Sequence, residues 1–226
     1  MKPIIGIIGR PDIKDRTMIK VNDSYRNAII YSGGIPLLIL PNQLKEYAKE
    51  LYNEVPSLSF EEEKDLIRVL ELCDGILMPG GIDGYEYDKF ICKYCIENNK
   101  PTLGICLGMQ IMSYYDNEYS LELIDTKVFN HNKQDKYVHE VIIEDNTLLS
   151  SIVKGKRFMV NSRHNCRITT LGKYKVSAVS KDGIIEAIEY PDNKFNIGIQ
   201  WHPEDLLYDD DNSKRIFDRF IEVCKR

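Results

Sequence analysis

The sequence predicts an α/β fold, a single domain with a mostly parallel central sheet, flanking helices and antiparallel additions. Three observations predict it. Short apolar runs alternate with helical segments in the first half, β-like runs fill the second half, and no Pro/Ser-rich linker divides the 226 residues. Alternating strands and helices imply parallel βαβ units with right-handed crossovers. We therefore expect residues 1–226 to form one domain.

The first half is expected to supply four parallel strands and the helices between them. Short continuous apolar runs are typical of strands covered on both faces, and they occur at 4–8, 36–40, 75–78 and 102–105. Helical patterns lie at 25–32, from 60 onward, at 90–98 and at 107–115. Ser59 and Glu62 have the spacing of a capping box, which indicates where the second helix begins. Residues 41–58 show no clear pattern.

The second half is expected to add strands in antiparallel order. Short β-like runs at 137–144, 174–180, 184–190 and 195–200 are separated by turns. A last helix is expected to begin at Asn212 or Ser213. Its predicted buried face consists of Ile216, Phe217, Phe220, Ile221 and Cys224.

Composition and charge exclude several classes of protein. The 30 Lys and Arg against 35 Asp and Glu give a net charge of −5, which argues against an electrostatic nucleic-acid binder. Apolar runs are too short for a transmembrane helix, and the first ten residues are too Gly-broken for a secretory signal. Six irregularly spaced cysteines do not form a disulfide framework, so we expect a reducing cytoplasm.

The sequence predicts no metal and no cofactor. The pair Cys92 and Cys95 has C-x-x-C spacing, but it lies in a helical stretch without a second pair. His131 and His139 have few carboxylates nearby and are interpreted as solvated or core side chains. The acidic residues 209–211 are expected to place carboxylates at the N-terminus of the last helix.

The strongest local signal is the segment Gly-Ile-Cys-Leu-Gly at 104–108, between a predicted strand and a predicted helix. This is the context of a nucleophile elbow with Cys106 in place of serine. Small flanking residues permit a strained turn, and the helix N-terminus behind it favours the reactive thiolate. A buried cysteine in a glycine-flanked turn would give the same local pattern.

Two further segments supply the groups that a cysteine nucleophile needs. His202 follows a predicted strand and can shuttle protons, while Glu204 can orient its imidazole. The alternative is a core histidine beside a helix N-terminal carboxylate. Pro79-Gly80-Gly81 also follows a strand, and its backbone can approach a ligand closely. The N–H groups of Gly81 and Leu107 can then hold an oxyanion, although a plain turn would need the same glycines.

Together these segments resemble the class I glutamine amidotransferase superfamily, and within it the γ-glutamyl hydrolase-like (peptidase C26) group, which includes γ-glutamyl-γ-aminobutyrate hydrolase. The likeness extends over most of the chain, through residues 3–7, 33–36, 77–81, 100–110, 160–164, 182–187 and 198–204. It implies a class I glutamine amidotransferase-like, flavodoxin-like fold. It also implies a Cys106–His202–Glu204 triad and a small γ-glutamyl substrate.

The resemblance further implies which residues hold the substrate. Gln110 and the segment Ser162, Arg163, His164 would bind the amino and carboxylate ends of the glutamyl group, beside Gly80, Gly81 and Leu107. Three departures from the group pattern border the leaving-group side. They are Leu107 where arginine is frequent, Gly84-Tyr85 where proline is usual, and residues 114–117 in place of a Gly-Gly-Thr stretch. We therefore expect a substrate whose glutamyl half is ordinary for the group and whose amine half is unusual.

The expected activity is hydrolysis of a γ-glutamyl amide through a γ-glutamyl thioester, which releases glutamate and an amine. The alternative is a glutaminase subunit that feeds ammonia to a separate synthase chain. A non-catalytic module that kept the pocket is a third class. No nucleic-acid or membrane partner is expected, and the sequence leaves open a homodimer.

Overall fold

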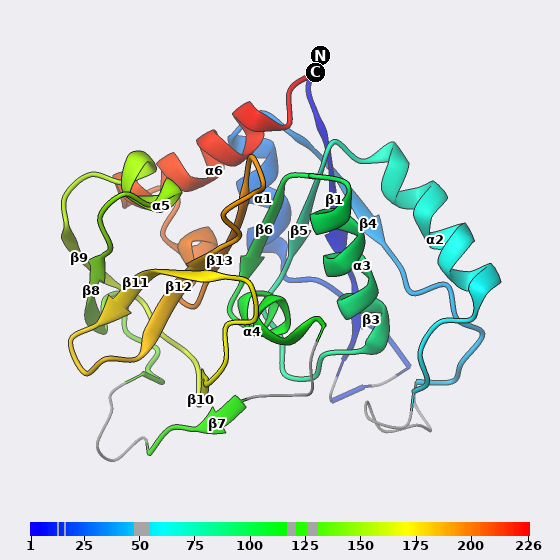
Figure 1. Ribbon diagram of the computed structural model, residues 1–226, viewed down its shortest axis with the longest axis horizontal. Helices are drawn as coiled ribbons and strands as arrows, with labels where there is room; N and C mark the ends of the chain where they lie inside the picture. The colour runs from blue at the N-terminus through cyan, green and yellow to red at the C-terminus, as the bar shows by residue number, and fades with distance from the viewer. Residues whose placement is uncertain (13, 16, 48–54, 117–120, 126–130) are drawn as a thin grey trace.

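The computed structural model describes the whole chain except residues 13, 16, 48–54, 117–120 and 126–130 (Figure 1). Its centre is a nine-stranded sheet in the order β4-β1-β5-β6-β13-β12-β11-β8-β9. The expected α/β class with a mostly parallel core is confirmed, since the first five of these strands are parallel.

The parallel strands follow the apolar runs of the sequence. They are β1 (Ile4–Ile8), β4 (Ile35–Ile39), β5 (Gly75–Met78), β6 (Thr102–Ile105) and β13 (Asn196–Ile199). One expectation is wrong here: β4 is not covered on both faces, because it is the edge strand, and Ile35 and Leu38 are exposed. An apolar run alone does not distinguish an edge strand from a central one.

The other strands form the antiparallel half and two small pairs. The sheet continues through β12 (Ile185–Glu189), β11 (Lys175–Ser180), β8 (His139–Ile143) and β9 (Arg157–Val160). The small pairs join β2 (Arg10–Pro11) to β3 (Ile19–Lys20) and β7 (Leu121–Leu123) to β10 (Cys166–Ile168).

The predicted antiparallel placement of β13 is wrong with respect to β6. β13 is antiparallel to β12 but runs parallel to β6, with Ile199 beside Ile105. The short connection after β12 reverses the chain direction, and β12 itself runs against the parallel set. The hairpin therefore returns the chain to the parallel direction, and β13 ends at the same sheet edge as β6.

Helices cover both faces of the sheet and form two cores. One core packs α1 (Asp23–Tyr31), α5 (Leu148–Ile152) and α6 (Asp211–Val223) against the sheet. The other packs α2 (Phe60–Leu72), α3 (Glu86–Glu97) and α4 (Leu107–Tyr114), and a 3-10 turn, η1, spans Pro203–Asp205. The predicted buried face of α6 is confirmed. Among the described residues, no helix has both the length and the apolar character needed to cross a bilayer.

The capping box at the start of α2 gives a first prediction. Ser59 Oγ accepts the Glu62 N–H, and the Glu62 carboxylate accepts the Ser59 N–H at 2.7 Å. We expect Ser59→Ala to lower the free energy of unfolding by about 1 kcal/mol, because it leaves a helix N–H without its side-chain acceptor. Urea denaturation measures this. Ser57→Ala, two residues earlier, is the control, and an equal loss in both variants would contradict the assignment.

Candidate active site

The three predicted chemical segments meet at the carboxyl ends of neighbouring parallel strands. Gly80 follows β5, Cys106 follows β6, and His202 follows β13, and these strands are adjacent in the sheet. Carboxyl ends of parallel strands lie at one edge, which is where open α/β sheets bind ligands. The order of the strands therefore brings together residues as distant in sequence as Gly80 and His202, which are 122 positions apart.

Cys106 has the backbone geometry of an elbow. Its φ of 53° and ψ of −107° are strained for a residue with a side chain. The turn is tight: a Cβ on Gly108 would lie 2.1 Å from the Met78 carbonyl oxygen, and one on Gly104 would lie 2.2 Å from Met112 Sδ. Both glycines are thus required by space, and the thiol is held in the pocket wall just before α4.

His202 is fixed from two directions. Its Nδ1 lies 2.7 Å from Glu204 Oε1, so the imidazole is oriented by a buried carboxylate. Its backbone is held by Asn161, whose Oδ1 accepts the His202 N–H at 2.9 Å and whose Nδ2 donates to the His202 carbonyl at 2.8 Å. Two backbone bonds and one side-chain bond leave Nε2 directed away from Glu204.

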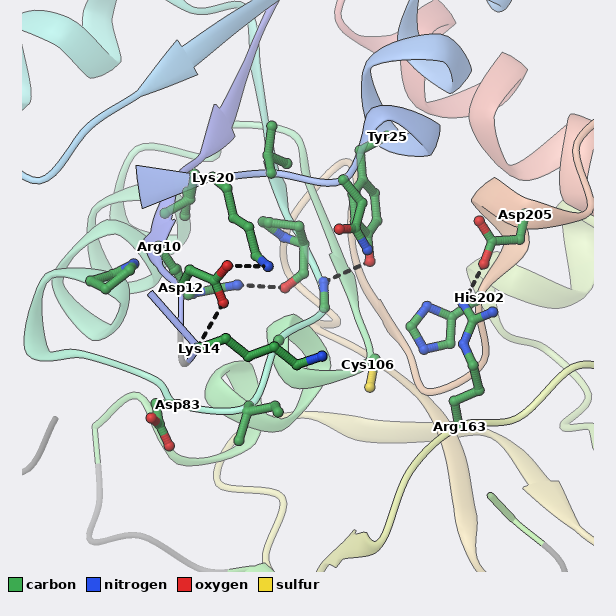
Figure 2. Close-up of a pocket in the computed structure, with 18 of the residues that line it drawn as sticks. Arg10, Asp12, Lys14, Lys20, Tyr25, Asp83, Cys106, Arg163, His202 and Asp205 are labelled. Carbon is green, nitrogen blue, oxygen red and sulfur yellow. Dashed lines mark hydrogen bonds and ion pairs between the residues drawn. The ribbon is translucent and has the colours of Figure 1, made fainter. Parts of the chain in front are cut away.

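The charges of the site favour a protonated imidazole. Burial alone would lower the pKa of His202, but the negative charges of Glu204 and Cys106, together with a hydrogen bond to Cys106, raise it to about 10. The thiol of Cys106 and the imidazole of His202 line the same pocket, and Figure 2 shows both on its wall. A protonated His202 can give its proton to a leaving amine.

The glycine loop after β5 is held by two residues from the N-terminal part of the chain. The Arg10 Nη1 donates to the Pro79 carbonyl at 2.7 Å, and Tyr25 Oη accepts the Gly80 N–H at 2.8 Å. Asp88 pairs with the buried Arg10 at 2.9 Å. The peptide between Pro79 and Gly80 is thus fixed on both sides, and the next donor along the loop is the Gly81 N–H.

Tyr25 gives a second prediction. Burial and then the charges of Glu204 and Cys106 raise the pKa of Tyr25, so its hydroxyl stays protonated. We expect Tyr25→Phe to lower kcat by about 10-fold, because a buried peptide loses its partner and the loop shifts. Steady-state kinetics measure this, with Tyr31→Phe on the exposed end of the same helix as control. Unchanged kcat in Tyr25→Phe would show that the loop needs no such support.

The pocket beside Cys106 has a volume of about 480 Å³ and is lined by charged side chains. Lys14, Lys20 and Asp12 come from the β2–β3 hairpin, and Lys20 Nζ pairs with Asp12 at 2.7 Å. Arg163 pairs with Asp205 on the opposite side (Figure 2). The pocket is large enough for a small polar substrate carrying its own charges.

The structure brings only some of the predicted substrate residues to this pocket. Gly80, Gly81 and Arg163 line it. The side chain of Leu107 is buried in the core and packs beside Gly81. Only its backbone N–H, at the start of α4, is therefore available to donate a hydrogen bond to a substrate. Gln110 is buried and donates to Gln200 Oε1 at 3.1 Å.

Ser162 and His164 face away from the pocket. The Ser162 hydroxyl donates to the His131 carbonyl at 2.7 Å, and the imidazole of His164 lies 3.2 Å from that of His131. Neither side chain is part of the pocket wall. Direct contact with substrate from this segment is therefore available to Arg163.

Sequence reasoning missed three supporting residues. Arg10 lies in a two-residue strand, Tyr25 looks like an ordinary apolar position on α1, and Asn161 lies in a polar turn. Each forms a hydrogen bond with backbone atoms of a residue far along the chain, and no local sequence pattern predicts such a contact. The family resemblance covers Asn161 but implies no role for it.

A family model described as Peptidase C26 matches residues 3–204. Gamma-glutamyl-gamma-aminobutyrate hydrolase PuuD from Escherichia coli (strain K12) is 28% identical, with 99% of this chain and 94% of that protein covered. A CTP synthase from Sulfolobus acidocaldarius is 31% identical over 82% of this chain but only 40% of its own length.

Solved structures show the same architecture. The glutaminase domain of Trypanosoma brucei CTPS with bound acivicin superposes with a TM-score of 0.68 at 18% identity, covering 99% of this chain and 94% of that one. PurLQS from Thermotoga maritima gives a TM-score of 0.64 at 16% identity, covering 100% of both chains. At such identities the likeness concerns the fold. With a family match over nearly its whole length, this chain belongs to the peptidase C26 family and is a hydrolytic enzyme of the glutamine amidotransferase type.

Proposed function

We propose that the protein hydrolyses the γ-glutamyl amide bond of a small γ-glutamyl compound, with Cys106, His202 and Glu204 as the triad. The observation that carries this is a single pocket lined both by a thiol on a strained elbow and by an imidazole whose Nδ1 lies 2.7 Å from a buried carboxylate. Nucleophile, proton carrier and orienting group are the three roles that define such a triad.

The proposed reaction has two halves. The Cys106 thiolate attacks the γ-carbonyl carbon, and the Gly81 and Leu107 N–H groups hold the resulting oxyanion. The C–N bond breaks as His202 gives its proton to the amine, which leaves a γ-glutamyl thioester. His202 then takes a proton from water, the hydroxide displaces the thiolate, and glutamate departs.

The pocket supports a charged substrate. Arg163 offers a guanidinium to the α-carboxylate of the glutamyl group, and Asp205 beside it offers a carboxylate to the α-amine. The hairpin residues Lys14, Asp12 and Lys20 lie on the other side, where the amine half would sit. We propose that Ser162, His164 and Gln110 contribute by holding this wall in place.

A panel of γ-glutamyl compounds tests the proposal. Purified protein is assayed for free glutamate with glutamine, γ-glutamyl-γ-aminobutyrate and bulkier γ-glutamyl amines. We expect at least one larger amide to be cleaved with a kcat/KM well above that for glutamine. Release of no glutamate from any member of the panel would contradict the proposal.

A glutaminase subunit acting with a separate synthase chain is the second candidate. The match to CTP synthase, whose own length is only 40% covered, favours it because there the matching region is one part of a longer protein. This candidate predicts activity on glutamine alone, low without a partner chain. The same panel therefore separates the two functions.

We also propose that residues 1–226 act as one domain in a reducing compartment, the cytoplasm. The nine-stranded sheet takes strands from both halves of the chain, which supports one domain. All six cysteines are free, which supports a reducing environment.

A further inference from the structure

Three of the four histidines of the chain converge on one buried glutamate outside the active site. His131, His139, His164 and Glu186 each offer one ligand atom, and these atoms all lie within 4.8 Å of one another. His131, His164 and Glu186 are almost completely buried. His131 is buried, as a core role predicts, and β8, β12 and two loops bring it together with His139, His164 and Glu186.

Each imidazole is anchored through its outer nitrogen. His164 Nδ1 lies 2.9 Å from the Cys166 carbonyl oxygen, His139 Nδ1 lies 3.3 Å from the Glu140 carbonyl, and His131 Nε2 lies 3.0 Å from Asp182 Oδ2. These oxygens accept hydrogen bonds, so the outer nitrogens must carry the protons. A neutral imidazole held this way turns its other nitrogen, with a lone pair, toward Glu186. Metal-binding histidines are oriented in the same manner.

Four of the six separations between the inner atoms fit a tetrahedron around a small cation. His131 Nδ1 lies 3.1 Å from Glu186 Oε1 and 3.2 Å from His164 Nε2. His139 Nε2 and His164 Nε2 lie 3.5 and 3.6 Å from the same carboxylate oxygen. Ligands about 2.0–2.1 Å from a zinc ion at tetrahedral angles are separated from one another by about 3.3–3.4 Å. The four measured separations bracket that value.

Hydrogen bonds within the protein account for only part of the cluster, namely the 3.2 Å contact between His131 Nδ1 and His164 Nε2. Among the described residues, neither oxygen of Glu186 nor Nε2 of His139 has a hydrogen-bond partner of acceptable geometry. The Glu186 carboxylate is fully buried among three imidazoles. A buried charge without aligned partners is costly unless a cation neutralises it.

We propose that His131, His139, His164 and Glu186 bind one Zn²⁺ ion in a closed tetrahedral site. Three imidazole nitrogens and one carboxylate oxygen are a ligand set that zinc accepts, and four protein ligands are typical of a structural site. The site would be separate from Cys106, His202 and Glu204, and it does not depend on the proposed reaction.

Zinc here would fix one wall of the pocket. The backbone N–H of His164 donates to the His131 carbonyl at 3.0 Å. The preceding residue, Arg163, lines the pocket. Asn161, three residues before His164, holds the backbone of His202. The metal would therefore tie this loop to the sheet and stabilise the placement of Arg163 and His202.

Metal content and metal affinity test the proposal directly. The full chain, freed of metal with a chelator, is titrated with ZnCl₂ against a competing chromogenic chelator, and bound zinc is counted by elemental analysis. We expect one zinc per chain, and Co²⁺ should give the intense visible absorption of a tetrahedral complex. Asp182→Asn removes the negative charge of an anchoring acceptor and should weaken zinc binding by about 10–100-fold. Glu186→Gln and His139→Ala should weaken it further.

His202→Ala is the matched control, because it removes the one histidine outside the cluster. It should keep one zinc per chain, which also separates this site from metal held by His202 and Glu204. Circular dichroism of each metal-free variant reports folding independently of metal. Wild-type protein that takes up no stoichiometric zinc, or a folded Glu186→Gln and Asp182→Asn with parental affinity, would overturn the proposal and leave a metal-free His–Glu cluster.

Discussion

Replacing Cys106 with alanine is expected to lower glutamate release by at least about 10³-fold while the protein stays folded. Among the described residues that line the pocket, Cys106 is the cysteine placed to form the covalent intermediate of the proposed reaction. Its side chain lines the pocket beside His202 at the margin of the core, and alanine keeps its Cβ, so we expect the sheet to be unchanged. Steady-state kinetics and thermal unfolding measure the two parts of this prediction.

Cys166→Ala is the matched control for that experiment. Cys166 is partly exposed on β10, and its backbone carbonyl lies 2.9 Å from His164 Nδ1, so the alanine variant keeps that contact. We expect parental kcat and KM from the control. Parental turnover by Cys106→Ala would remove the nucleophile from the mechanism.

Glu204→Gln is expected to lower kcat by about 10²–10⁴-fold. The glutamine amide is neutral and can present an N–H to His202 Nδ1, so the imidazole loses both its charge partner and its fixed orientation. Because Glu204 helps to raise the pKa of His202 to about 10, the variant should show a lower pKa for this residue. NMR titration of the His202 ring protons measures that shift.

The same change should alter how stability depends on pH. A raised pKa means that the protonated His202 stabilises the fold below its ordinary value of 6.5, and that this contribution is lost as the pH rises toward 10. The variant should therefore differ from the parent most below pH 6.5. Glu222→Gln, exposed on α6, is the control and should match the parent in kcat and in the His202 titration. A Glu204→Gln enzyme with parental kcat would show that orientation by Glu204 is not needed.

The sequence predicted the parts of the fold that local periodicity controls. Apolar runs located β1, β5 and β6, the Ser59–Glu62 spacing located α2, and the spacing of Ile216, Phe217 and Phe220 gave the buried face of α6. The direction of each strand and its position in the sheet are harder to predict from the sequence. That β13 runs parallel to β6, and that β4 is an edge strand, depend on neighbours that no local pattern specifies.

The candidate site divides in the same way. Cys106, His202 and Gly80 could be predicted because each follows a strand and sits in a compositionally unusual turn. Tyr25, Arg10 and Asn161 could not, since they act through single contacts with distant backbone atoms. The cluster at Glu186 was missed because its histidines are spread over 33 residues, from His131 to His164, and the carboxylate comes from another strand.

Trapping the covalent intermediate tests the mechanism most directly. The protein is mixed with a turned-over γ-glutamyl amide and quenched in acid, and the digested peptides are analysed by mass spectrometry. We predict that the peptide containing Cys106 gains the mass of one glutamyl group, and that Cys166→Ala gains it at the same position. A glutamyl adduct on another residue, or none while glutamate is being released, would contradict a thioester at Cys106.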